Sequence, residues 1–362
     1  MKDTTGAGAG GTSGCPTQLL ERNIERIKGT NLLVLGAPRD PKITSLFRHL
    51  RGVLQSFDYA AHLLNTQLAP LDGAGLTPVF AAACKKPEPA HDVVVAYLQK
   101  GKDANDCMLA MAGSVVSPGG RVFLVGENSA GIRSNAERLE ERVGPIEFTD
   151  SARHCVLYEA RAADTRAAVD LASWEKRFHV PNRTGGIEVV SLPGVFSHGR
   201  LDEGTGFLLP HIPTDISGAV LDFGCGSGVL GATIKALNPA CEVSLVDSNA
   251  FALLSTERTF AANGLAAREI RAVDGLDAVG DQRFNLIVTN PPFHQGIGTD
   301  YNVVTRFLES CEQHLHNDGV VLLVANRFLP YERMMPKSLP LSLVAEDAKY
   351  KVLKGRLKKA TR

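Results

Sequence analysis

The chain has 362 residues, of which 44% are hydrophobic and 22% charged, so it is long enough to form two domains of ordinary size. Its formal net charge is zero, which argues against a general binder of polyanions and requires any contact with nucleic acid to use a local basic patch. No apolar run is longer than a strand, so no segment is predicted to span a bilayer. The seven scattered cysteines include no C-x-x-C pair, which argues against a zinc site or a disulfide framework. Free thiols in a core suit the reducing cytoplasm, where we expect the protein.

The N-terminal half begins with a segment that carries no structural pattern. Met1–Gly14 is rich in Gly, Thr and Ser and lacks an apolar run, so we expect a disordered tail rather than a secretory signal. Three strand-and-turn segments follow at Asn31–Gly36, His91–Lys100 and Val116–Gly126. The turn after the first of them is Ala37-Pro-Arg-Asp40, which contains no glycine.

The C-terminal half predicts a doubly wound α/β domain. Short apolar runs alternate there with helical patterns, which is typical of a parallel sheet. The predicted strands are Ala219–Asp222, Glu242–Asp247, Glu269–Val273, Phe284–Thr289 and Val320–Ala325. Helices are predicted at Val229–Leu237 and Asn249–Asn263, with Gly264 at a left-handed C-cap. Such sheets bind ligands at the carboxyl ends of their strands, so residues just after each strand are the candidates for a site.

A glycine-rich loop follows the first of these strands. Its sequence, Asp222-Phe-Gly-Cys-Gly-Ser-Gly228, places Gly224, Gly226 and Gly228 where the backbone can turn sharply and approach a ligand. A dinucleotide site has the spacing G-x-G-x-x-G, whereas this loop reads G-x-G-x-G. The acid at Asp222 would repel a pyrophosphate but suits the methionyl ammonium of S-adenosylmethionine. The alternative is a tight turn that holds no ligand.

Two further acids end the next strands. Asp247 can accept hydrogen bonds from both hydroxyls of a ribose, and we include Ser248 beside it among the cofactor-binding residues. Asp274 follows the third strand and can accept a hydrogen bond from the adenine amine, with a turn or helix cap as an equal alternative.

The most informative stretch is Asn290-Pro-Pro-Phe293, directly after a predicted buried strand. Methyl transfer from a sulfonium is an in-line displacement, so positioning supplies most of the catalysis. An aromatic amine is a weak nucleophile, and two acceptors on its protons can orient it and support the developing charge. Asn290 offers its side-chain oxygen and Pro291 its backbone carbonyl. Pro292 stiffens the turn, and Phe293 offers a flat face on which a base can stack.

This loop does not identify the substrate. A rigid turn with a core phenylalanine is the structural alternative, and we expect the nearby His294, like His211, to be incidental rather than catalytic. The chain resembles the amino-methyltransferases with an N-P-P-[FY] loop, which act on adenine N6, cytosine N4, guanine N2 or protein glutamine. The loop alone does not separate these substrates, because each presents a planar amino group.

The two halves of the chain repeat each other. The three strand-and-turn segments of the N-terminal half recur in order, at similar spacing, in the C-terminal half, which indicates a duplicated domain. Tyr97-Leu-Gln-Lys100 stands where the second copy has Asn290–Phe293. We therefore expect the first copy not to methylate. Its segments Lys100–Lys102 and Gly126–Arg133 can contact RNA phosphates, with ordinary polar loops as the alternative.

Taken together, the motifs resemble the ribosomal RNA small subunit methyltransferase C family over nearly the whole chain, from about Asn31 to Lys359. The segments that carry this resemblance are Val125–Ser134, Asp150–Arg153, Leu192–Ser197, Leu201–Gly204, Asn290–His294 and Ala325–Tyr331. The N-terminal tail and an insertion around Lys85–His91 depart from the family pattern.

The resemblance implies an α/β protein of two tandem Rossmann-like (class I) methyltransferase domains, of which the N-terminal one is degenerate. It implies methylation of guanine N2 in 16S rRNA with S-adenosylmethionine as cofactor. The segment Gly194–Thr205 matches the part that closes over the methionine end of the cofactor, which adds Phe196 and Thr205 to the expected cofactor-binding residues. The expected partner is 16S rRNA or a small-subunit particle. We expect no metal and no membrane partner, and a monomer.

The expected domains are a tail and leading helix over 1–29, a degenerate domain over 30–183, a linker over 184–199 and a catalytic domain over 200–362. Lysines and arginines of the C-terminal stretch form either a basic patch or a solvated, frayed end; they are Lys349, Lys351, Lys354, Arg356, Lys358, Lys359 and Arg362. Three alternatives stay open: a large-subunit guanine-N2 enzyme, a methyltransferase of adenine or protein glutamine, and an inactive RNA-binding assembly factor.

Overall fold

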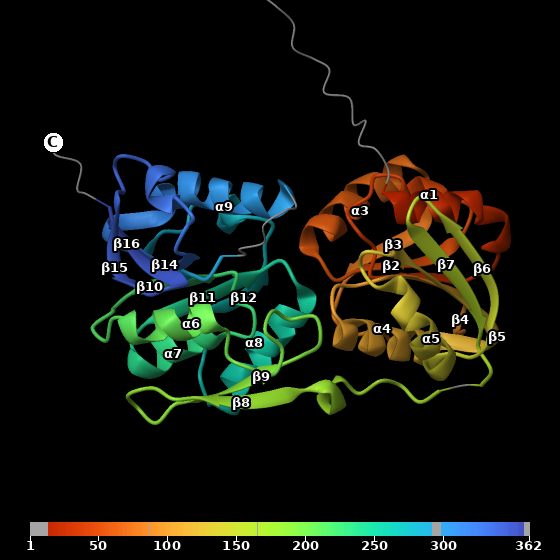
Figure 1. Cartoon of the computed structure of the whole chain (residues 1–362), viewed down its shortest axis with the longest axis horizontal. Coiled ribbons are helices and arrows are strands. Elements are labelled where there is room, and N and C mark those ends of the chain that lie inside the picture. Colours follow the sequence, from red (N-terminus) through yellow and green to blue (C-terminus); the bar gives the residue numbers. More distant parts are fainter. Residues whose placement is uncertain (1–13, 86, 165, 292–297, 358–362) are drawn as a thin grey trace, which may run out of the picture. The chain divides into compact units, whose positions relative to one another are not determined.

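The computed structural model describes residues 14–85, 87–164, 166–291 and 298–357 of the chain. By their internal contacts the residues form two compact units, Met1–Asp170 and Leu171–Arg362. Each unit is a seven-stranded sheet between helices (Figure 1).

The first unit has the strand order β3-β2-β1-β4-β5-β7-β6, in which the first five strands are parallel and β7 is antiparallel to both of its neighbours, β5 and β6. Its strands are β1 (Leu32–Leu35), β2 (Arg51–Ser56), β3 (Gly75–Phe80), β4 (His91–Tyr97), β5 (Val116–Glu127), β6 (Ile146–Ala152) and β7 (Cys155–Arg161). Its helices are α1 (Cys15–Arg22), α2 (Ile43–Leu46), α3 (Tyr59–Leu71), α4 (Lys102–Val115) and α5 (Ala136–Arg142).

The second unit repeats this order as β12-β11-β10-β13-β14-β16-β15. Its sheet strands are β10 (Ala219–Phe223), β11 (Glu242–Asp247), β12 (Glu269–Ala272), β13 (Phe284–Thr289), β14 (Leu315–Asn326), β15 (Leu341–Glu346) and β16 (Tyr350–Arg356). Its helices are α6 (Glu203–Leu208), α7 (Val229–Leu237), α8 (Ala250–Ala262) and α9 (Gly298–Ser310). The identical strand order confirms the predicted duplication and the tandem Rossmann-like architecture.

The core of the second unit lies on both faces of its sheet. Successive residues of a strand point to opposite faces, and β10 shows the consequence, because Val220 belongs to one buried cluster and Leu221 to the other. A parallel strand buried on both faces reads as a continuous apolar run. This is why the C-terminal strands could be predicted from short apolar segments.

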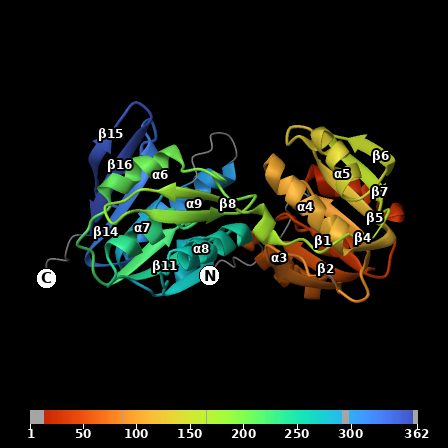
Figure 2. The same ribbon diagram turned by 90° about the horizontal axis from the view of Figure 1, so that it is seen from below.

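A hairpin of β8 (Lys176–Val180) and β9 (Ile187–Ser191) precedes the second sheet and runs along α8 (Figure 2). Side chains one helical turn apart on α8 bond the backbone edge of β9. Ser255 Oγ accepts from Leu192 N–H at 3.0 Å, Thr259 Oγ1 accepts from Val190 N–H at 3.0 Å, and Asn263 Oδ1 accepts from Glu188 N–H at 2.9 Å. Four helical residues rise about 6 Å and two strand residues about 6.6 Å, so the two repeats match over this length.

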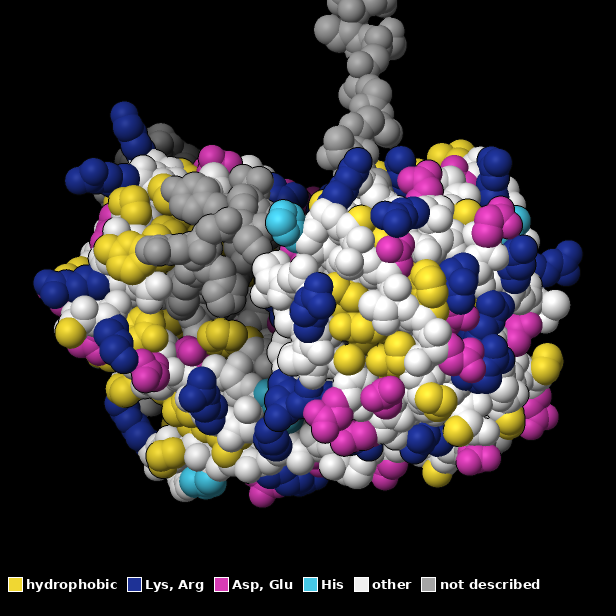
Figure 3. Space-filling model, turned by 45° about the vertical axis from the view of Figure 1, so that its right-hand side comes forward, with side chains coloured by type: hydrophobic (Ala, Val, Ile, Leu, Met, Phe, Trp, Pro, Cys, Tyr) yellow, Lys and Arg dark blue, Asp and Glu magenta, His cyan; other side chains and the backbone are white. Residues whose placement is uncertain are grey.

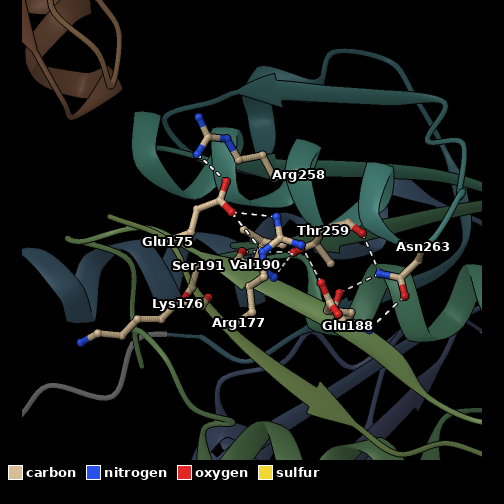
Figure 4. Close-up of polar contacts among 9 residues, drawn as sticks. All are labelled: Glu175, Lys176, Arg177, Glu188, Val190, Ser191, Arg258, Thr259 and Asn263. Carbon is tan, nitrogen blue, oxygen red and sulfur yellow. Dashed lines mark hydrogen bonds and ion pairs between the residues drawn. The ribbon is translucent and has the colours of Figure 1, made fainter. Parts of the chain in front are cut away.

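Charged side chains reinforce the same contact, as Figure 4 shows. Glu175 accepts from Arg258 at 2.6 Å and from Arg177 at 2.8 Å, and Arg177 also bonds Glu188 at 2.6 Å. The hairpin is thereby held to α8, the helix that follows the predicted ribose-binding acid.

The predicted linker 184–199 contains a strand, β9, and the division by contacts falls before the hairpin, between Asp170 and Leu171. Helix α1 packs on β5 and β7 of the first unit. The two-domain organisation is therefore present, while the exact limits proposed from the sequence stay a prediction.

The frayed-end alternative for the basic C-terminal stretch does not fit its described part, and two of the lysines of the proposed patch are paired with acids. Lys349–Arg356 is not a frayed end, because most of it forms β16 between β14 and β15. Lys351 is 7% exposed and donates to both carboxylate oxygens of Glu332, and Lys349 pairs with Glu203. These two lysines are neutralised locally. The other basic residues of the stretch beyond 357 lie outside the described part of the chain.

Candidate active site

The carboxyl ends of β10, β11 and β13 bring the predicted site residues to one edge of the second sheet. β10 lies between β11 and β13, and all three run parallel. The glycine loop leaves β10 and bends toward β11, because the N–H groups of Gly224 and Cys225 both donate to Val246 O, at 2.9 and 3.0 Å.

The glycines of this loop adopt a backbone conformation that other residues rarely tolerate. Gly224, Gly226 and Gly228 have φ values of 72°, 57° and 77°. A Cβ built on Gly224 or Gly226 would meet no atom of the described residues within 4 Å, whereas one on Gly228 would press on Thr256. The loop therefore borders open space at its first two glycines and packs on α8 at the third.

Asp247 lies beside this loop, as predicted. Its carboxylate accepts from Gly226 N–H and from Asn249 N–H, both at 2.9 Å. A carboxylate oxygen can accept more than one hydrogen bond, so the group is suited to ribose hydroxyls. The half-buried Ser248 follows it, and Val273 N–H donates to Asp247 O at 3.1 Å, which brings the segment with Asp274 to the same edge.

Asp222 is buried more deeply than a direct ligand contact suggests. Its side chain is 0% exposed, one oxygen accepts from Gly231 N–H in the first turn of α7, and Oδ1 has no partner among the described residues. Burial, followed by the charge of Asp247, raises the pKa of Asp222 to about 7. The contact that the structure shows for this acid is with the helix after the loop.

Asn290 stands at the carboxyl end of β13. Thr289 Oγ1 donates to Phe223 O at 2.7 Å, which ties the end of β13 to the end of β10, where the glycine loop begins. Pro291 is buried. Pro292 and Phe293, like His294, lie outside the described residues.

The Asn290 side chain is held through its nitrogen. Nδ2 donates to Asp202 Oδ2 and to Thr205 Oγ1, each at 2.8 Å, and Oδ1 is buried without a partner among the described residues. Thr205, predicted to contact cofactor, is 8% exposed and lies in α6. The structure thus brings Thr205 and Asn290 together, although the sequence predicted separate roles for them.

The segment between β9 and α6 reaches the same edge from another side. Asn249 Nδ2 donates to Gly194 O at 3.1 Å, so this segment is tied to the residue that caps α8 next to Asp247. Within it Phe196 is 58% exposed, and Ser197 has a φ of 55°. An exposed aromatic side chain at this position is compatible with the predicted cofactor contact.

The first unit has different residues at the corresponding positions. Ala96 pairs with Leu124 and Thr289 pairs with Leu323, at the same step of two 12-residue strands, so that Tyr97 corresponds to Asn290. Tyr97 is 3% exposed, and its hydroxyl lies 3.2 Å from Thr17 Oγ1.

The cofactor end of the first unit is also closed. Ser56, fully buried, ends β2 where Asp247 ends β11. A Cβ on Gly36, which follows β1, would lie 2.3 Å from Gln99 Nε2, so the unit's own glutamine fills the space that is open at Gly224. The predicted degeneracy of this unit has a physical basis in these side chains.

Sequence reasoning missed Asp202, Thr289 and Thr256, which hold the site together. Thr256 Oγ1 donates to Gly226 O at 3.0 Å and supports the glycine loop from α8. Asp202 carries a local signal, since an aspartate three residues before Thr205 can cap a helix, and its side chain does accept from Thr205 N–H at 2.8 Å. Its second hydrogen bond, from Asn290, joins residues far apart in the chain, and no local sequence pattern predicts it.

The described residues include neither a group of metal ligands nor a helix that could span a membrane. Among them, no three His, Cys, Asp or Glu side chains are grouped to hold a metal ion. Within the same ranges, no helix combines the length and apolarity that crossing a membrane requires.

Comparison with known proteins places both units in one family. Residues 17–178 match the N-terminal methyltransferase small domain, and residues 186–354 match the methyltransferase small domain. The ribosomal RNA small subunit methyltransferase C of Shewanella amazonensis is 36% identical over 338 residues, which cover 93% of this chain and 97% of the relative. Its counterpart in Pseudomonas paraeruginosa is 41% identical over 273 residues, 75% of this chain and 81% of the relative.

A solved structure shows the same fold. The 16S rRNA N2 methyltransferase of T. thermophilus, in complex with AdoMet and guanosine, matches with a TM-score of 0.79 at 24% identity, over 94% of this chain and 92% of that one. The identity and coverage of the curated relatives, together with the two matching domain models, show that the chain belongs to the ribosomal RNA small subunit methyltransferase C family.

Proposed function

We propose that the second unit transfers a methyl group from S-adenosylmethionine to the exocyclic N2 of a guanine in 16S rRNA. The observation that carries the proposal is the Asn290 amide, whose nitrogen has two acceptors and whose oxygen has no partner among the described residues. A buried acceptor without a donor is rare in native structures and calls for an explanation. A substrate amine supplies that donor.

The residues at the carboxyl edge fit the cofactor. The open space at Gly224 and Gly226 admits a ligand against the loop backbone. We assign the ribose hydroxyls to Asp247 and the adenine end to Asp274. The remaining proposed contacts are Asp222 and Gly228 of the loop, Ser248 beside Asp247, and Phe196 and Thr205 of the segment before β10. Bound there, S-adenosylmethionine supplies a sulfonium methyl group that is open to displacement.

The chain's own residues position the nucleophile. Asn290 Oδ1 and the Pro291 carbonyl accept the two N2 protons and aim the nitrogen at the methyl carbon. The N–C bond forms as the S–C bond breaks, positive charge develops on N2, and the two oxygens stabilise it. One proton then passes to water, so the mechanism requires no side-chain base. Phe293 is proposed as the stacking face for the base.

The substrate follows from the relatives rather than from the geometry. The names of these relatives specify the small ribosomal subunit. This favours 16S rRNA or a small-subunit particle over large-subunit RNA, adenine or protein glutamine. A guanine within a helix would have to leave its stack to reach Asn290. An rRNA substrate and the free thiols among the described cysteines support a cytoplasmic location.

Contacts with RNA outside the site are proposed for two loops of the first unit. Lys100–Lys102 follows β4 and Gly126–Arg133 begins at the end of β5, and these strands are parallel neighbours, so the loops leave the same edge. On the face of this unit drawn in Figure 3, Lys and Arg side chains are interspersed with Asp and Glu. This distribution favours local phosphate contacts over a broad basic surface.

Product analysis tests the substrate. The purified protein is incubated with methyl-labelled cofactor and, separately, with small-subunit RNA, small-subunit particles, large-subunit RNA and a protein extract. Digestion to nucleosides should place the label in N2-methylguanosine, from small-subunit RNA or particles only. Label in an amino acid, in adenosine or in large-subunit RNA would replace the proposal with the corresponding alternative. No cofactor binding by calorimetry would favour an assembly factor.

A further inference from the structure

The first proposed acceptor oxygen belongs to the Asn290 side-chain amide. The contacts that fix the orientation of this amide therefore matter for the site. The two ends of an amide are chemically opposite, yet their positions are usually assigned rather than observed. Here one partner decides the assignment. A carboxylate such as that of Asp202 accepts hydrogen bonds, so the NH2 end faces it, at 2.8 Å, and Oδ1 lies on the other side.

Asp202 is itself held firmly. The oxygen that accepts from Asn290 also accepts from Thr205 N–H at 2.8 Å, which makes Asp202 the N-cap of α6. α6 packs on β14 and β16 through the fully buried Leu208, and the exposed Glu203–Lys349 pair lies on its outer side. The carboxylate is therefore a fixed point on a packed element.

The packing leaves little room for an alternative arrangement. A Cβ on Gly204 would lie 3.2 Å from Asp202 Oδ2 and 3.3 Å from a ring carbon of Tyr350. The absence of a side chain at Gly204 thus lets α6 approach the sheet closely enough for Asp202 to reach Asn290.

We propose that Asp202 is the positioning residue of the methyl-transfer site: it holds the Asn290 amide with Oδ1 presented to the substrate amine. This inference rests on the proposed function, since it assigns a role to the same Asn290.

Three substitutions separate this role from helix capping. Asp202→Asn keeps an oxygen that can accept from both Thr205 N–H and Asn290 Nδ2. Asp202→Ser keeps a cap for α6, because serine caps helices well, but its oxygen is one bond shorter and falls about 1.3 Å short of Asn290. Asp202→Ala removes both contacts. Glu203→Gln, at the neighbouring position and outside the site, is the matched control.

Steady-state kinetics on the full chain, with small-subunit RNA or particles, should give a graded result. We expect kcat within about 3-fold of wild type for D202N and E203Q, and a fall of roughly 10- to 100-fold for D202S. The KM for S-adenosylmethionine and the affinity for S-adenosylhomocysteine should change less than about 3-fold in D202S. Unchanged kcat in D202S, parallel loss of kcat and cofactor affinity, or loss of activity in D202N would each overturn the proposal.

A double substitution distinguishes a role through Asn290 from a merely structural role of Asp202. Because Asp202 acts through Asn290, D202S should lower kcat no further when Asn290 is already alanine. Additive effects would contradict the proposal. The failure of the proposed function is distinguishable, since wild-type protein would then not form N2-methylguanosine, or Asn290→Ala alone would leave kcat unchanged.

Discussion

At the scale of single residues, Asp247 has a task distinct from that of Asn290. We expect Asp247→Ala to weaken cofactor binding about 10- to 100-fold, because hydrogen bonds to a charged group contribute about 1.5–3 kcal/mol. At saturating cofactor its kcat should stay within about 3-fold of wild type. Calorimetric titration with S-adenosylhomocysteine measures the first quantity. Glu242→Ala, at the other end of β11, is the control, and a variant that binds normally but turns over slowly would mean that the roles are exchanged.

Asp222 makes the stability of the folded protein depend on pH. Its pKa is about 7 in the folded protein because of burial, against the ordinary 3.8. Since the folded-state pKa is the higher one, folding favours the protonated form, and the carboxyl's contribution is complete below about pH 4 and lost as the pH rises toward 7. The shift corresponds to on the order of 4 kcal/mol.

Thermal unfolding of wild type and Asp222→Asn measures this dependence. The amide does not titrate, so the melting temperature of wild type relative to the variant should fall between about pH 4 and about pH 7. Parallel curves for the two proteins would show that Asp222 does not change its protonation over this range.

The candidate site was predictable to different degrees at this scale. Asp247 and Gly226 could be placed side by side because both follow strands that a parallel sheet sets next to each other. The burial of Asp222 was not predictable, since the same D-x-G pattern permits an acid that faces ligand or one that bonds the following helix. The Asp202–Asn290 bond depends on how α6 packs, which no local pattern records.

At the scale of elements, α8 is both a support for the glycine loop and the partner of β9. Thr259 Oγ1 accepts from Val190 N–H at 3.0 Å and lies 3.2 Å from Val190 O, and Val190 is fully buried. Thr259→Val would leave these groups unpaired, at a cost of about 1–3 kcal/mol in local stability. We expect faster amide hydrogen exchange over 187–191, measured by mass spectrometry.

Thr259→Ser is the control for this contact, because it keeps the hydroxyl and should restore slow exchange. Equal exchange in the valine variant and wild type would show that the hairpin is held without the Thr259 hydroxyl, leaving the ion pairs of Figure 4 as its support.

Regular elements were predicted well where an apolar period continues without interruption. α7 and β11 have the predicted bounds, because their apolar residues are buried on the expected faces. β9 was taken as part of a linker and β8 as the end of the first domain, since both strands are short and the hairpin packs on a helix rather than a sheet. β16 was missed because its lysines suggest a solvated end, although Lys351 is buried against Glu332.

At the scale of the whole molecule, duplication has left two sheets of identical order and one set of site residues. Gln99 and Tyr97 occupy the first unit where the second has open space and Asn290. Titration of the full chain with S-adenosylhomocysteine should therefore give about one equivalent bound per chain. Asp247→Ala should weaken that single event, and a second event that persists in the variant would show a functional site in the first unit.

The repeat itself was visible in the sequence, because apolar strand segments recur in order even after the loops have diverged. The missing glycine loop predicts that the first copy has no methyltransferase activity. How that copy fills the corresponding space could not be predicted from the sequence. Gln99 closes the space at Gly36 with a long side chain, and the direction of this side chain depends on packing.

The central claim is that Asn290 presents an acceptor oxygen to the amine that is methylated. Single-turnover methyl transfer, with protein and bound cofactor in excess over small-subunit RNA or particles, compares wild type with Asn290→Ala most directly. We expect the rate constant for formation of N2-methylguanosine to fall about 100- to 1,000-fold in the variant, while the affinity for S-adenosylhomocysteine changes less than about 3-fold. An unchanged rate constant, with cofactor bound normally, would contradict the account.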